Sequence, residues 1–268
     1  MLILFKYKWK HVLFWDILQK STARSLPCRK VIHIYKLLII VPAYNEEASL
    51  RTTIEMLRTQ PHDFVIVNDG STDRTAQIAE EAGALAINLP FNQGLAGAFL
   101  AGMQYAATHG YSHAIQFDAD GQHLPEYITP MLQTMAQDGA DIMIGSRFLD
   151  APMPRSLRML GSSLIRLMMK LTTGQHLTDP TSGMRMYNRR MIELFSSRTD
   201  LTPEPDTLAF LMRNETRVDE FPVKMQERLA GVSYLSSFAA VKYMARMVFS
   251  IMMIQFVRGK IRVQEAWK

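Results

Sequence analysis

The chain has 268 residues, of which 48% are hydrophobic, a length that suits one large domain with a small appendage. This apolar content excludes global disorder, and the presence of a single cysteine, Cys28, excludes an intrachain disulfide and argues against a cysteine-based zinc site. The net charge of +5 is unevenly distributed, because residues 37–223 carry 14 Lys and Arg against 22 acids while both ends are basic.

The N-terminal segment, residues 1–35, is a basic extension. Lys6, Lys8 and Lys10 interrupt its apolar residues, so it lacks the continuous apolar stretch of a signal peptide. It fits either an amphipathic helix lying in a membrane interface or a segment without fixed structure. Nucleic acid is a rival partner for basic ends, but no helix-turn-helix, zinc-finger or RNA-binding pattern accompanies them, so no nucleic-acid binding is expected. Solvated surface charge is the plain alternative.

From residue 36, short β-branched runs alternate with amphipathic stretches. This pattern is typical of repeated βαβ units and predicts an α/β domain with a mostly parallel central sheet flanked by helices. The predicted strands lie at residues 37–43, 64–70, 85–89, 113–120 and 140–148. The predicted helices between them lie at residues 46–59, 71–83, 94–110 and 125–139.

The pattern changes after residue 150. Residues 153–174 predict a helix with arginines away from a stripe of leucines, which are Leu157, Leu160, Leu164, Leu167 and Leu171. A loop is expected at residues 179–185, a short helix near residues 206–214 and a strand at residues 217–225.

The C-terminal part, residues 234–268, contains a strongly apolar stretch at residues 235–257. Lys242 and Arg246 interrupt it, and the uninterrupted run that remains is far shorter than the ~20 residues that cross a bilayer. We therefore predict an amphipathic helix that lies on a membrane or against a partner such as a membrane protein. Residues 36–233 then form the central domain between this helix and the basic extension.

Unusual polar residues follow five successive predicted strands. They occupy residues 42–46, 68–73, 92–94, 118–123 and 145–147. Because ligands of parallel α/β sheets bind at the carboxyl ends of the strands, these segments predict one crevice.

Asp118 and Asp120 are the sharpest feature of this crevice. Two carboxylates two residues apart at a strand end can reach one cation, and Mg²⁺ or Mn²⁺ prefers such oxygen ligands. Gln122 can add an amide oxygen, whereas His123 is expected to make a hydrogen bond or to pack. The cation would neutralise a diphosphate leaving group. A solvated turn is the alternative interpretation of this pair.

Seven motifs together resemble family 2 glycosyltransferases in order and spacing. They are VPAYNE (41–46), VNDGSTD (67–73), NQGLAGA (92–98), DADGQH (118–123), IGSRF (144–148), DPTSGMR (179–185) and QERLAGVS (226–233). Within that family the chain is most similar to dolichyl- and polyprenyl-phosphate sugar synthases. The resemblance spans residues 37–234 and implies the GT-A fold and inversion at the anomeric carbon.

The resemblance also implies a role for individual residues. On the donor side these are Pro42, Tyr44, Glu46 and Asp69 for the nucleoside, Asn92 and Gly94 beside the donor, and Arg228 over the diphosphate. Asp118, Asp120 and Gln122 would bind the metal, and Arg147 would hold phosphate. Arg158 and Ser162 would grip an acceptor phosphate, so that Asp120, Arg147, Arg158 and Ser162 are expected to act in the transfer. When each residue is considered by itself, a packing or surface role is the favoured interpretation for Tyr44, Arg158 and Arg185.

Two positions depart from the family pattern. Asn68 stands where the second motif usually has an aspartate, which raises the question of a shifted base preference. Leu95 stands where a basic residue is common, so the diphosphate would depend more on the metal and Arg228.

The acceptor decides the chemistry that the site needs. A lipid phosphate is already an anion and needs no base, whereas a sugar hydroxyl needs a carboxylate such as Asp179 or Glu204. The basic ends and the apolar C-terminal helix favour a polyprenyl phosphate, with the protein peripheral to the cytoplasmic face of a membrane. The alternatives are a hexosyltransferase that uses a polysaccharide or lipid-linked glycan hydroxyl, and a sugar-nucleotide-binding protein without turnover.

Overall fold

The computed structural model describes residues 35–154, 157–226 and 237–257, with the backbone alone described for residues 157–158, 237–241 and 254–257. A compact unit begins at Tyr35. Except for Tyr35, the predicted N-terminal extension, residues 1–35, lies outside the described residues, as does the predicted donor-side Arg228.

The centre of the fold is a seven-stranded sheet in the order β3-β2-β1-β4-β6-β5-β7. The first three strands in the chain are β1 (Leu37–Ala43), β2 (Asp63–Asn68) and β3 (Ala86–Asn88). They are followed by β4 (His113–Gln116), β5 (Ile142–Ser146), β6 (Arg185–Asn188) and β7 (Val218–Pro222). Strand β6 runs antiparallel between β4 and β5, and the remaining pairs are parallel. The predicted mostly parallel α/β sheet is thus confirmed.

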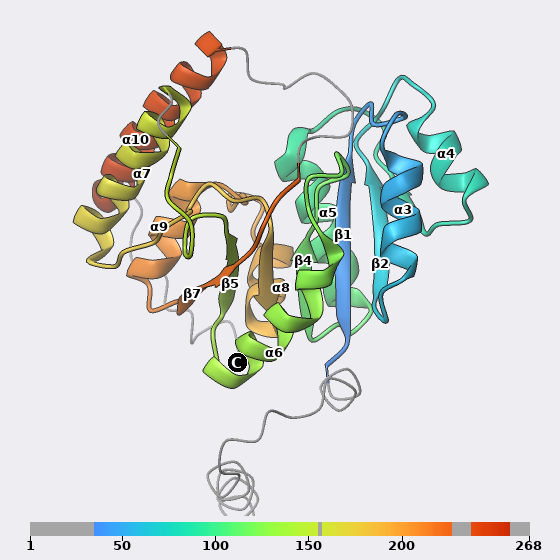
Figure 1. Ribbon diagram of the computed structural model, residues 1–268, viewed down its shortest axis with the longest axis horizontal. Coiled ribbons are helices and arrows are strands. Elements are labelled where there is room, and N and C mark those ends of the chain that lie inside the picture. Colours follow the sequence, from blue (N-terminus) through green and yellow to red (C-terminus); the bar gives the residue numbers. More distant parts are fainter. Residues whose placement is uncertain (1–34, 155–156, 227–236, 258–268) are drawn as a thin grey trace, which may run out of the picture. The chain divides into compact units, whose positions relative to one another are not determined.

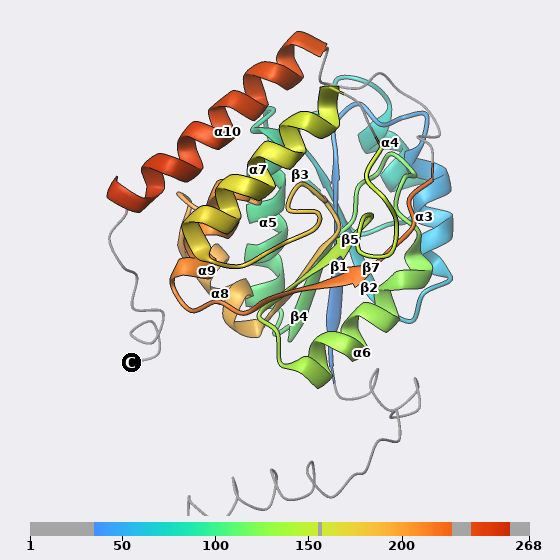
Figure 2. The ribbon, with the colours of Figure 1, turned by 60° about the vertical axis from the view of Figure 1, so that its left-hand side comes forward.

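Helices cover both faces of this sheet (Figure 2). On one face lie α5 (Gly94–Thr108) and α8 (Arg189–Ser197), which pack against each other. On the other face lie α3 (Leu50–Arg58), α4 (Thr75–Glu81) and α6 (Ile128–Asp138), the last preceded by a single turn, η1 (Pro125–Tyr127). The sequence pattern did not predict β6 or α8.

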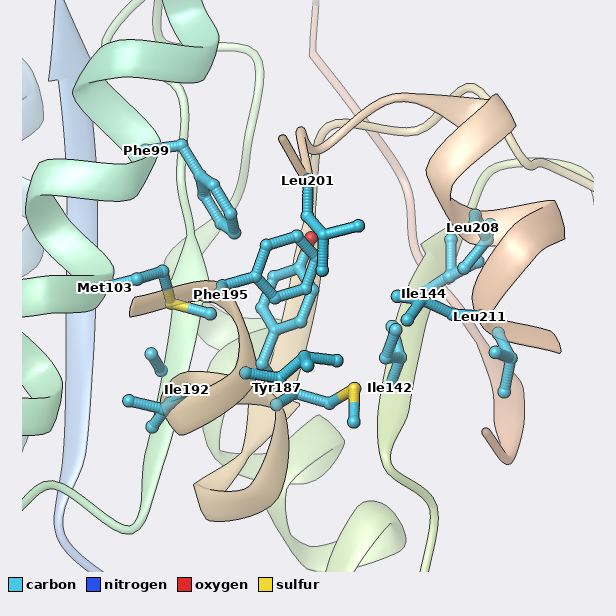
Figure 3. Close-up of a cluster of buried hydrophobic side chains, with 14 of the residues drawn as sticks. Phe99, Met103, Ile142, Ile144, Tyr187, Ile192, Phe195, Leu201, Leu208 and Leu211 are labelled. Atoms are coloured by element: carbon cyan, nitrogen blue, oxygen red, sulfur yellow. The ribbon is translucent and has the colours of Figure 1, made fainter. Parts of the chain in front are cut away.

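The small residues of α5 let it approach the sheet closely. An added side-chain carbon on Gly102 would lie 2.3 Å from the Cγ2 atom of Ile40 on β1. Beyond this contact, Phe99 of α5 meets Tyr187 of β6 and Phe195 of α8, with ring centroids 5.2–5.4 Å apart (Figure 3). This aromatic cluster joins the N-terminal and C-terminal halves of the sheet in one core.

Three further helices form a layer of their own. They are α7 (Leu157–Thr173), α9 (Pro205–Arg213) and α10 (Ser237–Val257). Helices α7 and α10 lie side by side and both contact α9 (Figure 1). The contact is tight, because an added carbon on Gly161 would lie 2.6 Å from the Cγ atom of Met244. Among the described helices, none has the length and apolarity required of a membrane span.

The helix α7 buries a different face from its leucine stripe. Ser162, Ile165 and Met169 point into the protein and are at most 1% exposed. The stripe faces outward, and its described members are Leu160, Leu164, Leu167 and Leu171, each at least 44% exposed. The outer surface of α7 is therefore apolar.

A buried histidine makes the stability of this fold depend on pH. His113 begins β4, is 7% exposed and lies edge-on to Tyr35, with ring centroids 4.9 Å apart. Burial lowers the pKa of His113 from 6.5 to about 4. Between these values the unfolded chain binds a proton that the folded chain does not, so folding loses up to about 3 kcal/mol as pH falls.

We therefore expect His113→Gln to flatten the acid limb of the stability profile. From about pH 7.5 to pH 5, the free energy of unfolding of the wild type should fall by about 2 kcal/mol more than that of the variant. Urea unfolding at the two pH values measures this difference. Other titrating groups, including the partly buried His62, are common to both proteins and cancel. Equal pH dependence in the two proteins would show that His113 does not contribute.

Candidate active site

A cavity of about 540 Å³ lies at the carboxyl ends of β1, β2 and β4. The parallel pairing of these strands brings their ends to one edge of the sheet. The cavity wall contains eight of the ten residues predicted to bind the donor or the metal, which are Pro42, Tyr44, Glu46, Asp69, Asn92, Gly94, Asp118 and Asp120. The structure thus gathers the ends of separate motifs in one place.

Backbone hydrogen bonds fix the loop that carries the two aspartates. The N–H of Asp118 donates to Nδ1 of His123 at 3.0 Å, and the N–H of Gln122 donates to Oδ1 of Asp120 at 3.0 Å. The side chain of Asp118 is 36% exposed, whereas Asp120 is 5% exposed. Both carboxylates line the cavity.

Gly183 allows the opposite wall to approach Asp118. An added side-chain carbon at Gly183 would lie 2.7 Å from Oδ2 of Asp118. Any larger residue would therefore displace the carboxylate or the loop. Gly183 belongs to the motif DPTSGMR, but nothing in the sequence indicates that it faces the acidic pair.

His123 supports the pair from behind. Because its Nδ1 accepts the Asp118 N–H, its Nε2 carries the hydrogen, and Nε2 lies 3.6 Å from Oδ2 of Asp118. The ring also packs edge-on against Phe117. This tautomer leaves no ring nitrogen for a metal.

The residues present fit a divalent cation whose coordination shell a bound ligand would complete. The described part of the chain holds no group of three or more acidic, histidine or cysteine side chains with metal-binding geometry. Asp118 and Asp120 are hard oxygen donors, and Mg²⁺ characteristically uses one or two carboxylates together with phosphate and water. Gln122, the third predicted ligand, is not part of the cavity wall, and its backbone carbonyl accepts the N–H of Gln226.

Asp69 joins two loops beside the cavity. Its Oδ1 accepts the N–H of Gln93 at 2.7 Å, and its own N–H donates to the carbonyl of Ala43. Gly70, with a φ of +65°, allows the backbone of Phe91 to come within 2.6 Å of where a Cβ would stand. The Asn92–Gly94 segment is thereby held against the ends of β1 and β2.

Asn68 does not face the cavity. Its Nδ2 donates to Oδ1 of Asn88 at 2.9 Å and its Oδ1 accepts the N–H of Ser71, so the amide joins β2 to β3. Asn68, which departs from the family pattern, therefore has a structural role within the sheet. Leu95, the other departure, does line the cavity and is 47% exposed.

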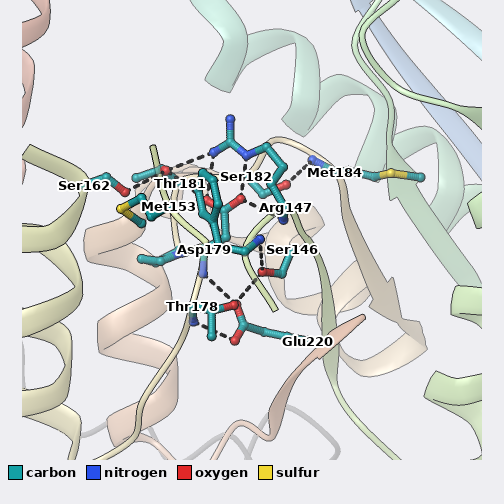
Figure 4. Close-up of polar contacts among 12 residues, drawn as sticks. Ser146, Arg147, Met153, Ser162, Thr178, Asp179, Thr181, Ser182, Met184 and Glu220 are labelled. Atoms are coloured by element: carbon teal, nitrogen blue, oxygen red, sulfur yellow. Dashed lines mark hydrogen bonds and ion pairs between the residues drawn. The ribbon is translucent and has the colours of Figure 1, made fainter. Parts of the chain in front are cut away.

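Arg147 is held by a buried network rather than by the cavity (Figure 4). Its Nε and Nη2 donate to the two oxygens of Asp179 at 2.6 and 2.8 Å, and Asp179 is fully buried. Glu220 in turn accepts the N–H groups of Thr178 and Asp179. Arg147 is not part of the cavity wall, but Thr181 is. Nη2 of Arg147 lies 3.4 Å from Oγ1 of Thr181.

Ser162 reaches the same threonine from α7. Its Oγ lies 3.4 Å from Oγ1 of Thr181, although Ser162 is 1% exposed. Arg147 and Ser162, far apart in sequence, thus converge on one residue of the cavity wall. Arg158 lies one turn before Ser162 on α7, and its side chain lies outside the described residues.

Arg185 holds the loop before β6. Its guanidinium donates to the backbone carbonyls of Pro180, Ser182 and Pro203 at 2.6–3.1 Å, and the residue is 4% exposed. Arg185 thus has the packing role that was the favoured interpretation, and it also lines the cavity.

Among the wall residues that sequence reasoning missed are a glutamine and a tyrosine. Gln116 ends β4 and Tyr243 belongs to α10, and both line the cavity. A glutamine in a strand and a tyrosine in an apolar helix give no chemical signal by themselves. Tyr243 donates its O–H to Glu204, and burial together with the Glu204 carboxylate raises the pKa of Tyr243.

Comparison with known proteins places this site in a family. The model of Glycosyl transferase family 2 matches residues 38–195. A polyprenol monophosphomannose synthase from Mycolicibacterium smegmatis is 31% identical, over 74% of this chain and 80% of that protein. An undecaprenyl-phosphate mannosyltransferase from Micrococcus luteus is also 31% identical, over 75% and 88%.

Two further similarities support the assignment. A UDP-N-acetylglucosamine–dolichyl-phosphate N-acetylglucosaminyltransferase from Methanococcus voltae is 29% identical, over 69% of this chain and 84% of that protein. Glucosyl-3-phosphoglycerate synthase from Mycobacterium tuberculosis, crystallised with Mn²⁺, UDP and phosphoglyceric acid, has the same fold, with a TM-score of 0.62 and 14% identity over 88% and 84% of the two chains. The chain therefore belongs to glycosyltransferase family 2 and has the GT-A fold.

Proposed function

We propose that the protein transfers a sugar from a nucleotide-diphosphate sugar to a polyprenyl phosphate at a membrane surface, with inversion at the anomeric carbon. The observation that carries this proposal is the convergence of Arg147 and Ser162 on Thr181, at the wall of the cavity that holds Asp118 and Asp120. A donor phosphate and an acceptor phosphate can then occupy neighbouring positions. The polyprenyl-phosphate substrates in the names of the three relatives support the same acceptor class.

On the donor side, Asp118 and Asp120 would hold Mg²⁺ or Mn²⁺, and the bound cation would stabilise the nucleoside diphosphate as it leaves. Tyr44 and Glu46 lie where the nucleoside would enter, and Asp69 keeps the Asn92–Gly94 loop in position. Gly94, with a φ of +76° and open space around it, presents backbone to the donor.

On the acceptor side, the phosphate oxygen would form the new bond to the anomeric carbon while the bond to the diphosphate breaks. The nucleophile is already an anion, so positioning and charge are the main requirements. Asp179 uses both oxygens on Arg147, which leaves Nη1 pointing away from Asp179 (Figure 4). That edge of the guanidinium is suited to a phosphate.

A hydroxyl acceptor is the second candidate, because Glu204 is a carboxylate in the cavity wall. The other proposed base, Asp179, is fully buried and bonded through both oxygens, which makes it unsuited to accept a proton. The linkage of the product separates the two acceptor classes, since a glycosyl phosphate hydrolyses in mild acid and a glycoside does not.

The outer surface of α7 and α10 is suited to a lipid membrane. Besides the leucine stripe of α7, this surface exposes Phe249, Met252 and Met253 of α10. The exposed charges on the two helices include Lys170, Lys242 and Arg246, and residues 151–178 and 228–264 contain no Asp or Glu. An apolar face with basic and no acidic residues is suited to anionic lipid, which attracts the charges and takes up the apolar side chains.

We expect Asp120→Asn to reduce sugar transfer by at least about 100-fold, because one anionic ligand of the cation is lost. The asparagine oxygen can still accept the Gln122 N–H, so the loop should keep its structure. Turnover with Mn²⁺ and circular dichroism measure the two effects. Asp138→Asn, an exposed position at the end of α6, is the matched control. Unchanged turnover in Asp120→Asn would refute the metal assignment.

Arg147→Ala should raise the apparent KM for polyprenyl phosphate by about 10- to 100-fold, the loss of one charge-assisted contact. Binding of the nucleoside diphosphate should change little. Because the single variant leaves Asp179 buried without its cation, the double variant Arg147→Ala/Asp179→Asn is measured beside it. Arg198→Ala, in an exposed ion pair, is the control. A larger effect on the nucleotide than on the acceptor would move Arg147 to the donor side.

Leu160→Glu/Leu167→Glu should weaken binding to anionic phosphatidylglycerol vesicles at least about tenfold, since both leucines leave water in the docked state. Both side chains are exposed, so unfolding in urea should be unchanged. Leu85→Glu, at a position that is also about half exposed and lies before β3, is the matched control. Sedimentation with vesicles measures the binding. Equal binding of the wild type and the double variant would exclude this surface.

A further inference from the structure

Gln116 carries a buried acceptor atom that lacks a partner. The residue is 2% exposed and lines the cavity. Its Nε2 donates to Oδ1 of Asp118 at 3.2 Å, which fixes the orientation of the amide. Within the described part of the chain, its Oε1 has no hydrogen-bond partner, and it is the one such buried side-chain atom whose residue lines the cavity. Leaving it unpaired costs about 1–3 kcal/mol, so a donor from a ligand is expected there.

A second acceptor, the carboxylate of Glu204, lines the same cavity as Gln116. Antiparallel pairing of β4 and β6 places Gln116 opposite Arg185, so that both side chains lie on one face of the sheet. Nη1 of Arg185 donates to the carbonyl of Pro203, the residue before Glu204. Glu204 also lines the cavity and accepts the O–H of Tyr243 from α10. Gln116, Glu204 and Tyr243 thus belong to one wall.

This wall selects a particular ligand chemistry. An amide oxygen and a carboxylate are both acceptors, and the carboxylate is negatively charged. Tyr243 stays protonated because burial and Glu204 raise its pKa, so its O–H remains directed at Glu204. The guanidinium of Arg185, which also lines the cavity, donates to three backbone carbonyls, so the groups left for a ligand are acceptors and suit a neutral group with several O–H donors. A sugar ring meets this requirement.

We propose that Gln116 and Glu204 form the subsite that recognises hydroxyl groups of the donor sugar, with Tyr243 as the residue that positions Glu204. This inference rests on the proposed function and specifies which residues read the sugar rather than the nucleoside or the phosphates. A site built to hydrogen-bond a hydroxyl discriminates strongly against an analogue that lacks it, because its buried acceptor is then left unpaired. Gln116 therefore acts as a determinant of sugar specificity.

The test compares binding of a nucleoside diphosphate with binding of the corresponding nucleotide sugar. Calorimetry with UDP or GDP, the matching nucleotide hexoses and Mn²⁺ gives both affinities for the wild type, Gln116→Leu and Glu204→Gln. In both variants the affinity for the nucleotide sugar should fall about tenfold, while that for the nucleoside diphosphate stays within about twofold. Gln104→Leu, the same substitution at an exposed position of α5, should change neither.

Monodeoxy analogues of the preferred nucleotide sugar sharpen the test. The wild type should bind the analogue that lacks the hydroxyl bonded to Gln116 about tenfold more weakly than it binds the parent nucleotide sugar. Gln116→Leu should bind that analogue and its parent equally. Tyr243→Phe should reduce discrimination at the hydroxyl read by Glu204, an effect that a purely structural role of the phenol would not produce.

The outcomes separate this inference from the proposed function. If Gln116→Leu weakens the nucleoside diphosphate and the nucleotide sugar equally, Gln116 only orients Asp118 and the sugar subsite is refuted. Unchanged binding of both ligands would show that Oε1 holds no more than water, with the same consequence. If the wild type binds no nucleotide sugar at all, the proposed function fails together with the subsite.

Discussion

Repulsion between carboxylates at one end of the sheet is the constraint on which the site depends. Glu46, Asp69, Asp118, Asp120 and Glu204 all line the cavity, and Arg185 is a buried cation in its wall. Like charges so close together in a partly buried space destabilise the folded chain unless hydrogen bonds or a cation offset them. The protein offsets some of this repulsion itself, through the N–H groups of Gln93 and Gln122 and the phenol of Tyr243. The acidic pair at Asp118 and Asp120 remains suited to a divalent cation.

The same constraint explains how the proposed donor and acceptor sides differ. On the donor side, carboxylates are positioned by backbone N–H groups and face the cavity. On the acceptor side, the carboxylates of Asp179 and Glu220 are turned inward, where they hold Arg147 and the loop around Thr178. The charges of Arg147, Asp179 and Glu220 sum to −1, so the positive charge near Thr181 is local to the Nη1 edge of the Arg147 guanidinium, which Asp179 leaves unused. In the proposed reaction, a bound cation would offset the charge of the donor diphosphate, and Arg147 would offset that of the acceptor phosphate.

Much of this arrangement follows from the sequence, because parallel strands bring the residues after them to one edge. The strands β1, β2, β4 and β5 and the acidic pair could be predicted in this way, since buried β-branched runs end in polar residues. Strand β6 and helix α8 could not, because β6 has four residues and α8 follows it without a turn. Periodicity predicted the leucine stripe of α7 but could not show that Ser162, Ile165 and Met169 form its buried face. The role of Asp179 in holding Arg147 could not be predicted either, because the two residues lie 32 positions apart in the chain.

Calorimetric titration of Mn²⁺ and a nucleoside diphosphate tests the central claim most directly. Two carboxylates are too few to hold the ion alone, so Mn²⁺ should bind weakly to the free protein and at least about tenfold more tightly when UDP or GDP is present. By linkage, the nucleotide should gain the same factor from the metal. Nucleotide affinity that is unaffected by Mn²⁺, or tight Mn²⁺ binding without nucleotide, would contradict a site completed by the donor diphosphate.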